Sequence, residues 1–148
     1  MSVVAAGLLF LCTPTAVWDG DGPVWCAERI RSGGMDRPIR IRLAGIAARE
    51  TDGSCRRWQP CPPASAEAAT GALVDLLGGR QGERSTGHVL VSGPQLRCRS
   101  DGPARGDRTA AWCELPDGRD LSCAMVGTGT VAIWPRFWGD HSCSRPDR

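Results

Sequence analysis

Two short segments carry residue types that could act on a phosphate ester. The first, VWDGDG, brings together Asp19 and Asp21. The second, RLAGIAARE, places Arg42 and Glu50 at the two ends of an apolar run. Hydrolysis of a phosphodiester needs a base that orients water, and cations placed where negative charge accumulates. An arginine, a glutamate and carboxylates that could hold a metal ion are a sufficient set for this chemistry.

The composition is that of a soluble globular chain without a strong charge bias. Its 148 residues fit one domain, and its net charge of +2 gives no general attraction to nucleic acid or membranes. All 18 basic residues are arginine. Genome composition explains this bias, although a planar guanidinium also suits bidentate contacts to phosphate.

The eight cysteines predict disulfides rather than a zinc site, because their number is even and no C-x-x-C pair occurs. Four disulfides imply an oxidising compartment, so we expect an exported protein, periplasmic or extracellular. Among the 105 connectivities we favour bonds between cysteines that flank turns or loops, and one that ties down the tail. The expected pairs are Cys12–Cys26, Cys55–Cys61, Cys98–Cys113 and Cys123–Cys143.

The N-terminal residues are apolar, but no basic residue precedes them as in a standard signal peptide. We therefore expect residues 1–9 to be a leader remnant or the start of the first strand. Residues 10–143 then form the single domain, and residues 144–148 a frayed tail. The apolar run is too short to span a bilayer, so no membrane insertion is expected.

Hydrophobic periodicity predicts a mainly β fold with helices, of the α+β class. Residues 39–46 alternate apolar and basic, as in a half-buried strand. Residues 65–79 carry an apolar stripe with Ser65 as N-cap, as in an amphipathic helix. Further strands are predicted at 10–18, 24–30, 88–93, 95–100, 110–115 and 130–134, with a short C-terminal helix at 120–127. Short antiparallel strands with one helix after the third suggest a five-stranded barrel of the OB type.

The order of these motifs resembles the staphylococcal nuclease-like (thermonuclease) family. V-x-D-G-D is followed by R-L-x-x-I-x-x-x-E, an amphipathic helix and G-D-R before a strand, over about residues 10–138. The resemblance implies an OB barrel that cleaves phosphodiester bonds of DNA or RNA, usually with calcium. It implies that Asp21 binds the metal, that Arg42 and Arg108 contact the phosphate, and that Glu50 is the general base.

The chain departs from the family pattern around the implied metal site. The second aspartate of the pattern falls on Ala47, and the proline falls on Arg49. Only Asp21 and Asp19 remain as carboxylate ligands, whereas Ca²⁺ needs several oxygens. The expectation is therefore weakly bound calcium or no metal. We hypothesise that Arg49 takes over part of the metal's charge; the alternative is a simple ion pair with a surface acid.

The contacts to bases expected in this family are also altered, because the chain has no tyrosine. Trp134 and Trp138 lie near the expected place of a stacking aromatic residue, and Arg136 between them is a candidate for phosphate binding. The alternative is that at least one of these tryptophans closes the bottom of the barrel.

Three functions remain open from the sequence. The first is a thermonuclease-like enzyme with weakened or absent calcium dependence, acting on single-stranded DNA or RNA as a monomer. The second is a catalytically impaired OB module that binds single-stranded nucleic acid or another phosphate-bearing ligand. The third is a disulfide-stapled domain whose tryptophans bind a protein partner.

Overall fold

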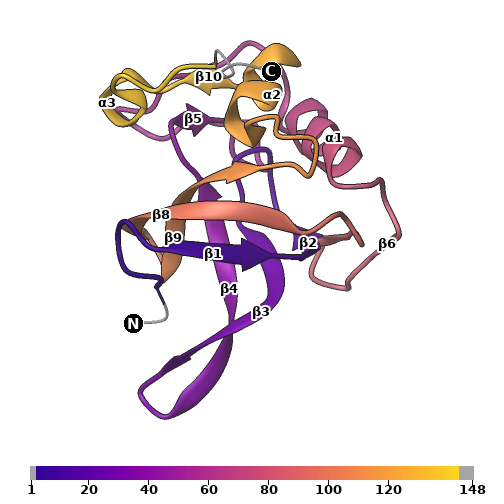
Figure 1. Ribbon diagram of the computed structural model, residues 1–148. Coiled ribbons are helices and arrows are strands. Elements are labelled where there is room, and N and C mark those ends of the chain that lie inside the picture. Colours follow the sequence, from indigo (N-terminus) through magenta and orange to yellow (C-terminus); the bar gives the residue numbers. More distant parts are fainter. Residues whose placement is uncertain (1–2, 144–148) are drawn as a thin grey trace.

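A computed structural model describes residues 3–143, which are mainly β with three helices (Figure 1). Eight strands form one mixed sheet in the order β1-β8-β9-β4-β3-β2-β7-β6, which is not closed into a barrel, and β5 and β10 form a second sheet. The strands are β1 Leu9–Cys12, β2 Pro14–Val17, β3 Val24–Ser32, β4 Met35–Leu43, β5 Ile46–Ala47, β6 Gly82–Glu83, β7 Val89–Leu90, β8 Leu96–Ala104, β9 Arg108–Glu114 and β10 Ala132–Ile133. The helices are α1 Ala66–Leu76, α2 Leu121–Gly127 and α3 Pro135–Trp138.

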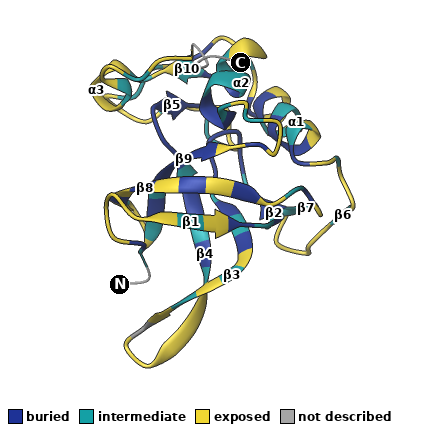
Figure 2. Ribbon diagram, viewed as in Figure 1, coloured by how far each residue is buried: buried dark blue, intermediate teal, exposed yellow. Residues whose placement is uncertain are grey.

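The hairpin of β3 and β4 projects from the rest of the fold, and its tip is exposed (Figure 2). Its two-residue loop consists of Gly33 and Gly34, which have φ of 59° and 79°. Positive φ at both positions matches the twist of the hairpin and favours glycine. Further along β4, Ile41 and Leu43 are fully buried. The predicted alternation is confirmed, and it turns Arg42 to the opposite face.

The parallel pairing of β4 with β9 brings distant parts of the chain together. Arg42 of β4 lies opposite Ala110 of β9. Arg108 is two residues before Ala110, so its side chain lies on the same face of the sheet as those of Ala110 and Arg42. Because β8 pairs antiparallel with β9, the strands that carry the two arginines belong to one group of paired strands, β4, β9 and β8. The sheet therefore positions two guanidinium groups that are separated by 66 residues in the sequence.

Helix α1 supports the turn that carries the two aspartates. Its N-cap is Ser65, whose side chain accepts a hydrogen bond from the Ala68 amide, and it buries Ala69 and Leu73 as predicted. A Cβ atom at Gly20 would lie 2.4 Å from the Ala69 Cβ. The helix thus approaches the D-G-D turn so closely that only glycine fits between the aspartates.

The four predicted disulfides are present, and the described residues contain no free cysteine. They are consistent with an oxidising compartment. They fall into two pairs of different accessibility. Cys12–Cys26 joins β1 to β3, Cys98–Cys113 joins the paired strands β8 and β9, and both disulfides are buried. Cys55–Cys61 closes a loop, and Cys123–Cys143 ties the C-terminal segment to α2; both contain an exposed cysteine.

Several local predictions differ from the structure. The expected strand at 10–18 is interrupted at Thr13, and the expected last strand at 130–134 is reduced to β10. Helix α3 was not predicted; its proline at the first turn fits a helix start. The Val4 amide donates to the Thr109 side chain, so part of the segment 1–9 packs on β9. The predicted tail at 144–148 lies outside the described residues.

No helix within residues 3–143 has the length and apolar character needed to cross a bilayer.

Candidate functional site

A cleft of about 1130 Å³ collects most of the residues that the sequence analysis singled out. Asp19 and Asp21 come from the turn after β2, Arg42 from β4, Glu50 from the loop after β5, and Arg108 from β9. They are drawn from segments almost ninety residues apart in the sequence, and the fold brings all five to one depression. The five residues, which the sequence analysis grouped by motif order, therefore also lie at one cleft in the structure.

Arg42 is held rigidly at the floor of the cleft. One terminal nitrogen, Nη1, donates to the carbonyls of Leu43 and Ile46, each at 2.8 Å. The other, Nη2, lies 3.4 Å from Oδ2 of Asp21. The guanidinium also lies over the ring of Trp134, at 5.9 Å from its centroid. A cation fixed in this way is preorganised for an anion that enters the cleft.

Asp21 is buried, and its Oδ2 atom already has two partners. The Ala48 amide donates to it at 2.9 Å, and the guanidinium of Arg42 lies beside it. The carboxylate therefore fixes both the turn after β5 and the arginine. This arrangement satisfies a buried charge with a cation and an amide.

Asp19 lies in a different electrostatic environment. Burial, together with the neighbouring charge of Asp21, raises the pKa of Asp19 to about 9. Its Oδ1 accepts a hydrogen bond from the Asp21 amide at 3.2 Å. The raised pKa favours the neutral, protonated form of the Asp19 carboxyl group.

Glu50 lines the cleft and is paired with an arginine that the sequence analysis missed. Its Oε1 atom accepts a hydrogen bond from Nε of Arg56 at 2.9 Å, and its side chain is 26% exposed. Arg56 comes from the loop closed by Cys55–Cys61. The carboxylate is thus accessible to water, and its direction is set by the loop.

Arg108 is half-buried and shares the cleft with Arg42. Burial, and then the nearby charge of Arg42, lower the pKa of Arg108. Its Nε donates to the Arg105 carbonyl, which leaves both terminal nitrogens without a partner among the described residues. Two cations close together in a partly buried site are costly unless an anion joins them.

Of the predicted substrate-binding residues, the structure places two in the cleft and two elsewhere. Trp134 and Arg136 line it. Trp138 does not; it packs edge-to-face on Trp112, with ring centroids 5.5 Å apart. Arg49 donates instead to loop carbonyls, those of Pro62 and Gly53 at 2.9 and 2.8 Å. Its position gives no support to the hypothesis that it replaces a metal.

The residues at the implied calcium position do not fit that ion. Ala47 is fully buried and offers no side-chain oxygen, while Oδ2 of Asp21 is occupied by an amide and a guanidinium. Oδ1 of Asp19 already accepts a hydrogen bond from the Asp21 amide. Ca²⁺ needs six to eight oxygen ligands, with carboxylates that carry charge. The donor set therefore falls short of what Ca²⁺ requires.

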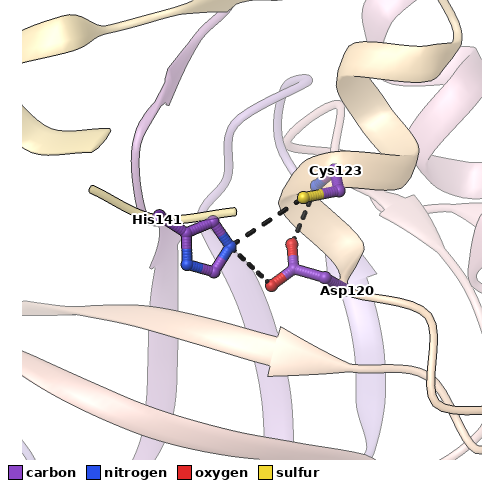
Figure 3. Close-up of side chains that lie close together, drawn as sticks. All are labelled: Asp120, Cys123 and His141. Carbon is purple, nitrogen blue, oxygen red and sulfur yellow. Dashed lines mark hydrogen bonds and ion pairs between the residues drawn. The ribbon is translucent and has the colours of Figure 1, made fainter. Parts of the chain in front are cut away.

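A second polar cluster, formed by Asp120, Cys123 and His141, has metal-like spacing (Figure 3). Their ligand atoms lie within 4.8 Å of one another, and His141 Nε2 lies 2.9 Å from Asp120 Oδ2. However, Cys123 is bonded to Cys143 and has no thiolate to offer. We refer to these residues as the tail cluster, because they hold the C-terminal segment against α2.

The cleft has an excess of positive charge that single motifs did not reveal. Among the described residues, seven arginines and four carboxyl groups line it. The arginines are Arg40, Arg42, Arg56, Arg57, Arg105, Arg108 and Arg136. Two strongly exposed aromatic side chains, Trp58 and Phe137, stand at the same cleft. The sequence CRRWQPC, in which a tryptophan follows two arginines inside a small loop, was the available signal for three of these residues.

No family model matches this chain, and no curated protein matches its sequence.

Proposed function

We propose that the cleft binds the phosphodiester backbone of a single nucleic-acid strand and hydrolyses it, with weakened or absent dependence on calcium. One observation carries this proposal: Arg42, Glu50 and Arg108 line a single cleft in which arginines outnumber carboxyl groups. A phosphate diester is the anion that suits several guanidinium groups at once.

In this mechanism the protein's own cations take the role of a metal. Arg42 and Arg108 bind the non-bridging oxygens and stabilise the charge that develops on them. Glu50 accepts a proton from water while the water oxygen bonds to phosphorus. The bond from phosphorus to the leaving oxygen breaks, and that oxygen takes up a proton. Arg56 moves from Glu50 to the phosphate as the substrate enters, which frees the carboxylate to act as the base.

We also propose that five of the strands are arranged as in the OB type when β1 and β2 are taken as one bent strand, although the hydrogen-bonded strand order by itself is open. Its support is the continuity of β1 and β2, which are separated by Thr13 alone. The first pairs with β8 and the second with β3, while the Ala27 amide donates to the Thr13 carbonyl. Read as one bent strand, this segment joins β8 to β3 and completes the ring through β4 and β9.

A second candidate function is a module that binds single strands without cutting them. The observation in its favour is that Glu50 is engaged by Arg56 and that Asp21 is engaged by Arg42. Both carboxylates then serve to fix cations, and the arginine-rich cleft with its aromatic residues suffices for binding.

The test is cleavage of a labelled single-stranded DNA by the wild type and by Glu50→Gln, in calcium and in EDTA. The enzyme proposal expects cleavage in EDTA, lowered about 10²–10⁴-fold by the substitution. Glu83→Gln is the matched control, because it removes an exposed Arg–Glu ion pair that is not part of the cleft.

Other outcomes select the alternatives. Salt-dependent binding without cleavage by the wild type would support the binding module. Absence of binding to DNA and RNA would overturn both proposals and favour a domain with a protein partner.

A further inference from the structure

Trp58 is exposed to an extent unusual for its size. The side chain is 82% exposed, the largest value among the exposed large hydrophobic residues described. Its backbone φ is 72°, in the left-handed region that non-glycine residues rarely adopt. Residues with such backbone strain cluster at ligand sites, which makes the exposed indole a candidate binding surface.

The loop that carries this tryptophan is fixed on several sides. The Cys55–Cys61 disulfide closes it, and the Gln59 side chain donates to the Ala48 carbonyl at 2.8 Å. Arg49 binds the carbonyls on either flank of the loop, those of Gly53 and Pro62. The indole is therefore presented from a rigid platform rather than from a loose loop.

The position of the loop links the indole to the proposed base. Trp58 lines the cleft, and Arg56, two residues earlier, bonds to Glu50 at 2.9 Å. The guanidinium of Arg57 lies 4.9 Å from the indole centroid, on its face. The guanidinium lies over one face of the ring, so the indole offers its other face as a flat apolar surface beside a positive charge. Such a surface suits a base together with its phosphate.

We infer that Trp58 is a stacking platform for a nucleobase of the strand whose phosphate lies at Arg42 and Arg108. This inference rests on the proposed function and adds a requirement for an unpaired base next to the bound phosphate. Bases in a duplex are already stacked and cannot reach the ring, so the cleft selects single-stranded nucleic acid.

The test compares two fluorescently labelled ligands of equal length and charge, oligo(dT) and an abasic oligomer with the same phosphates. The wild type is expected to bind oligo(dT) more tightly. Trp58→Ala should weaken binding of oligo(dT) about tenfold and leave binding of the abasic oligomer unchanged, while Trp58→Phe keeps most of the difference. Leu9→Ala is the matched control, because that side chain is 80% exposed and does not line the cleft.

The outcomes separate this inference from the proposed function. Equal loss for both ligands, or no loss for oligo(dT), would overturn the stacking role while the phosphate site stands. If the wild type binds neither ligand, both ideas are wrong. Replacing Cys55 and Cys61 together by serine gives a second measurement: it should reproduce part of the selective loss of oligo(dT) affinity, because the platform loses its closure.

Discussion

The cleft and the tail cluster both place carboxyl groups beside nitrogen-containing side chains, arginine in the cleft and histidine in the tail cluster. They differ in how many of their hydrogen-bonding groups have a partner. In the tail cluster, Asp120 Oδ1 accepts from the Cys123 amide and Oδ2 from His141. His141 is stacked on Trp112 with ring centroids 3.7 Å apart. In the cleft, Arg108 retains unpartnered terminal nitrogens among the described residues, and positive charge is in excess.

This difference separates a cluster whose polar groups satisfy one another from a cleft in which some cations lack a partner among the described residues. Spacing alone favours the tail cluster as a metal centre, but its sulfur is in a disulfide and its carboxylate is fully used. The cleft has poorer metal geometry and groups that still require an anion. Unsatisfied charge is therefore a better indicator of a ligand than short distances between potential ligand atoms.

The largest expected effect comes from removing the central cation of the cleft. Arg42→Ala should lower cleavage about 10²–10³-fold, because the transition state loses a fixed donor. It should also lower the free energy of unfolding by about 3 kcal/mol, because Asp21 is left buried without its cation. Cleavage assays and urea unfolding measure the two effects, with Arg42→Lys as the variant that keeps the charge. Unchanged cleavage by Arg42→Ala would remove the cleft from the mechanism.

Opening the tail cluster should affect stability and spare activity. Replacing Cys123 and Cys143 together by serine removes a bond that closes a loop of sequence separation 20. The expected cost is about 3 kcal/mol in the free energy of unfolding, with the rate of DNA cleavage unchanged. Chemical unfolding and the cleavage assay on the same sample test this. A large loss of cleavage with a folded protein would show that the two regions are coupled.

The buried acid of the cleft should make stability depend on pH. The pKa of Asp19 is about 9 in the folded chain against an ordinary 3.8, so the folded state binds more protons between these values. The free energy of unfolding then falls as pH rises through this window. Asp19→Asn should raise the free energy of unfolding at pH 8 by about 1–2 kcal/mol and flatten the slope. A steeper slope in Asp19→Asn would contradict the assigned pKa.

The smallest effect is expected from metal ions. Neither region offers a complete ligand set, because Ala47 lacks an oxygen and Cys123 is in a disulfide. Millimolar Ca²⁺ or Zn²⁺ should therefore shift the Tm of the oxidised protein by less than about 1 °C. Thermal unfolding with each ion and with EDTA checks this. A rise of several degrees with Ca²⁺, lost in Asp21→Asn, would restore a calcium site in the cleft.

Local patterns predicted those parts of the molecule that local physics determines. The alternation around Arg42 gave the correct buried face, the cap at Ser65 gave the start of α1, and cysteines flanking turns or loops gave the four disulfides. Arg42, Glu50 and Arg108 were found through motif order, and the fold places them in one cleft.

The remaining features depend on contacts between distant segments, which no window of sequence contains. Arg56 matters because its loop folds back on Glu50, and Trp58 because the same loop reaches the cleft. The packing of Trp138 on Trp112, 26 residues earlier in the chain, is another such contact. Burial by tertiary neighbours also raises the pKa of Asp19, although the D-G-D motif alone predicts an ordinary turn acid.

The parallel pairing of β4 with β9 determines when the two arginines of the cleft come together during folding. Arg42 and Arg108 come together only when β4 pairs with β9. Contacts between residues far apart in the sequence form slowly during folding. A ribosome-bound or truncated chain that ends before β9 carries Arg42 without its counterpart. The arginine pair of the proposed phosphate site is therefore complete only once β9 has paired with β4.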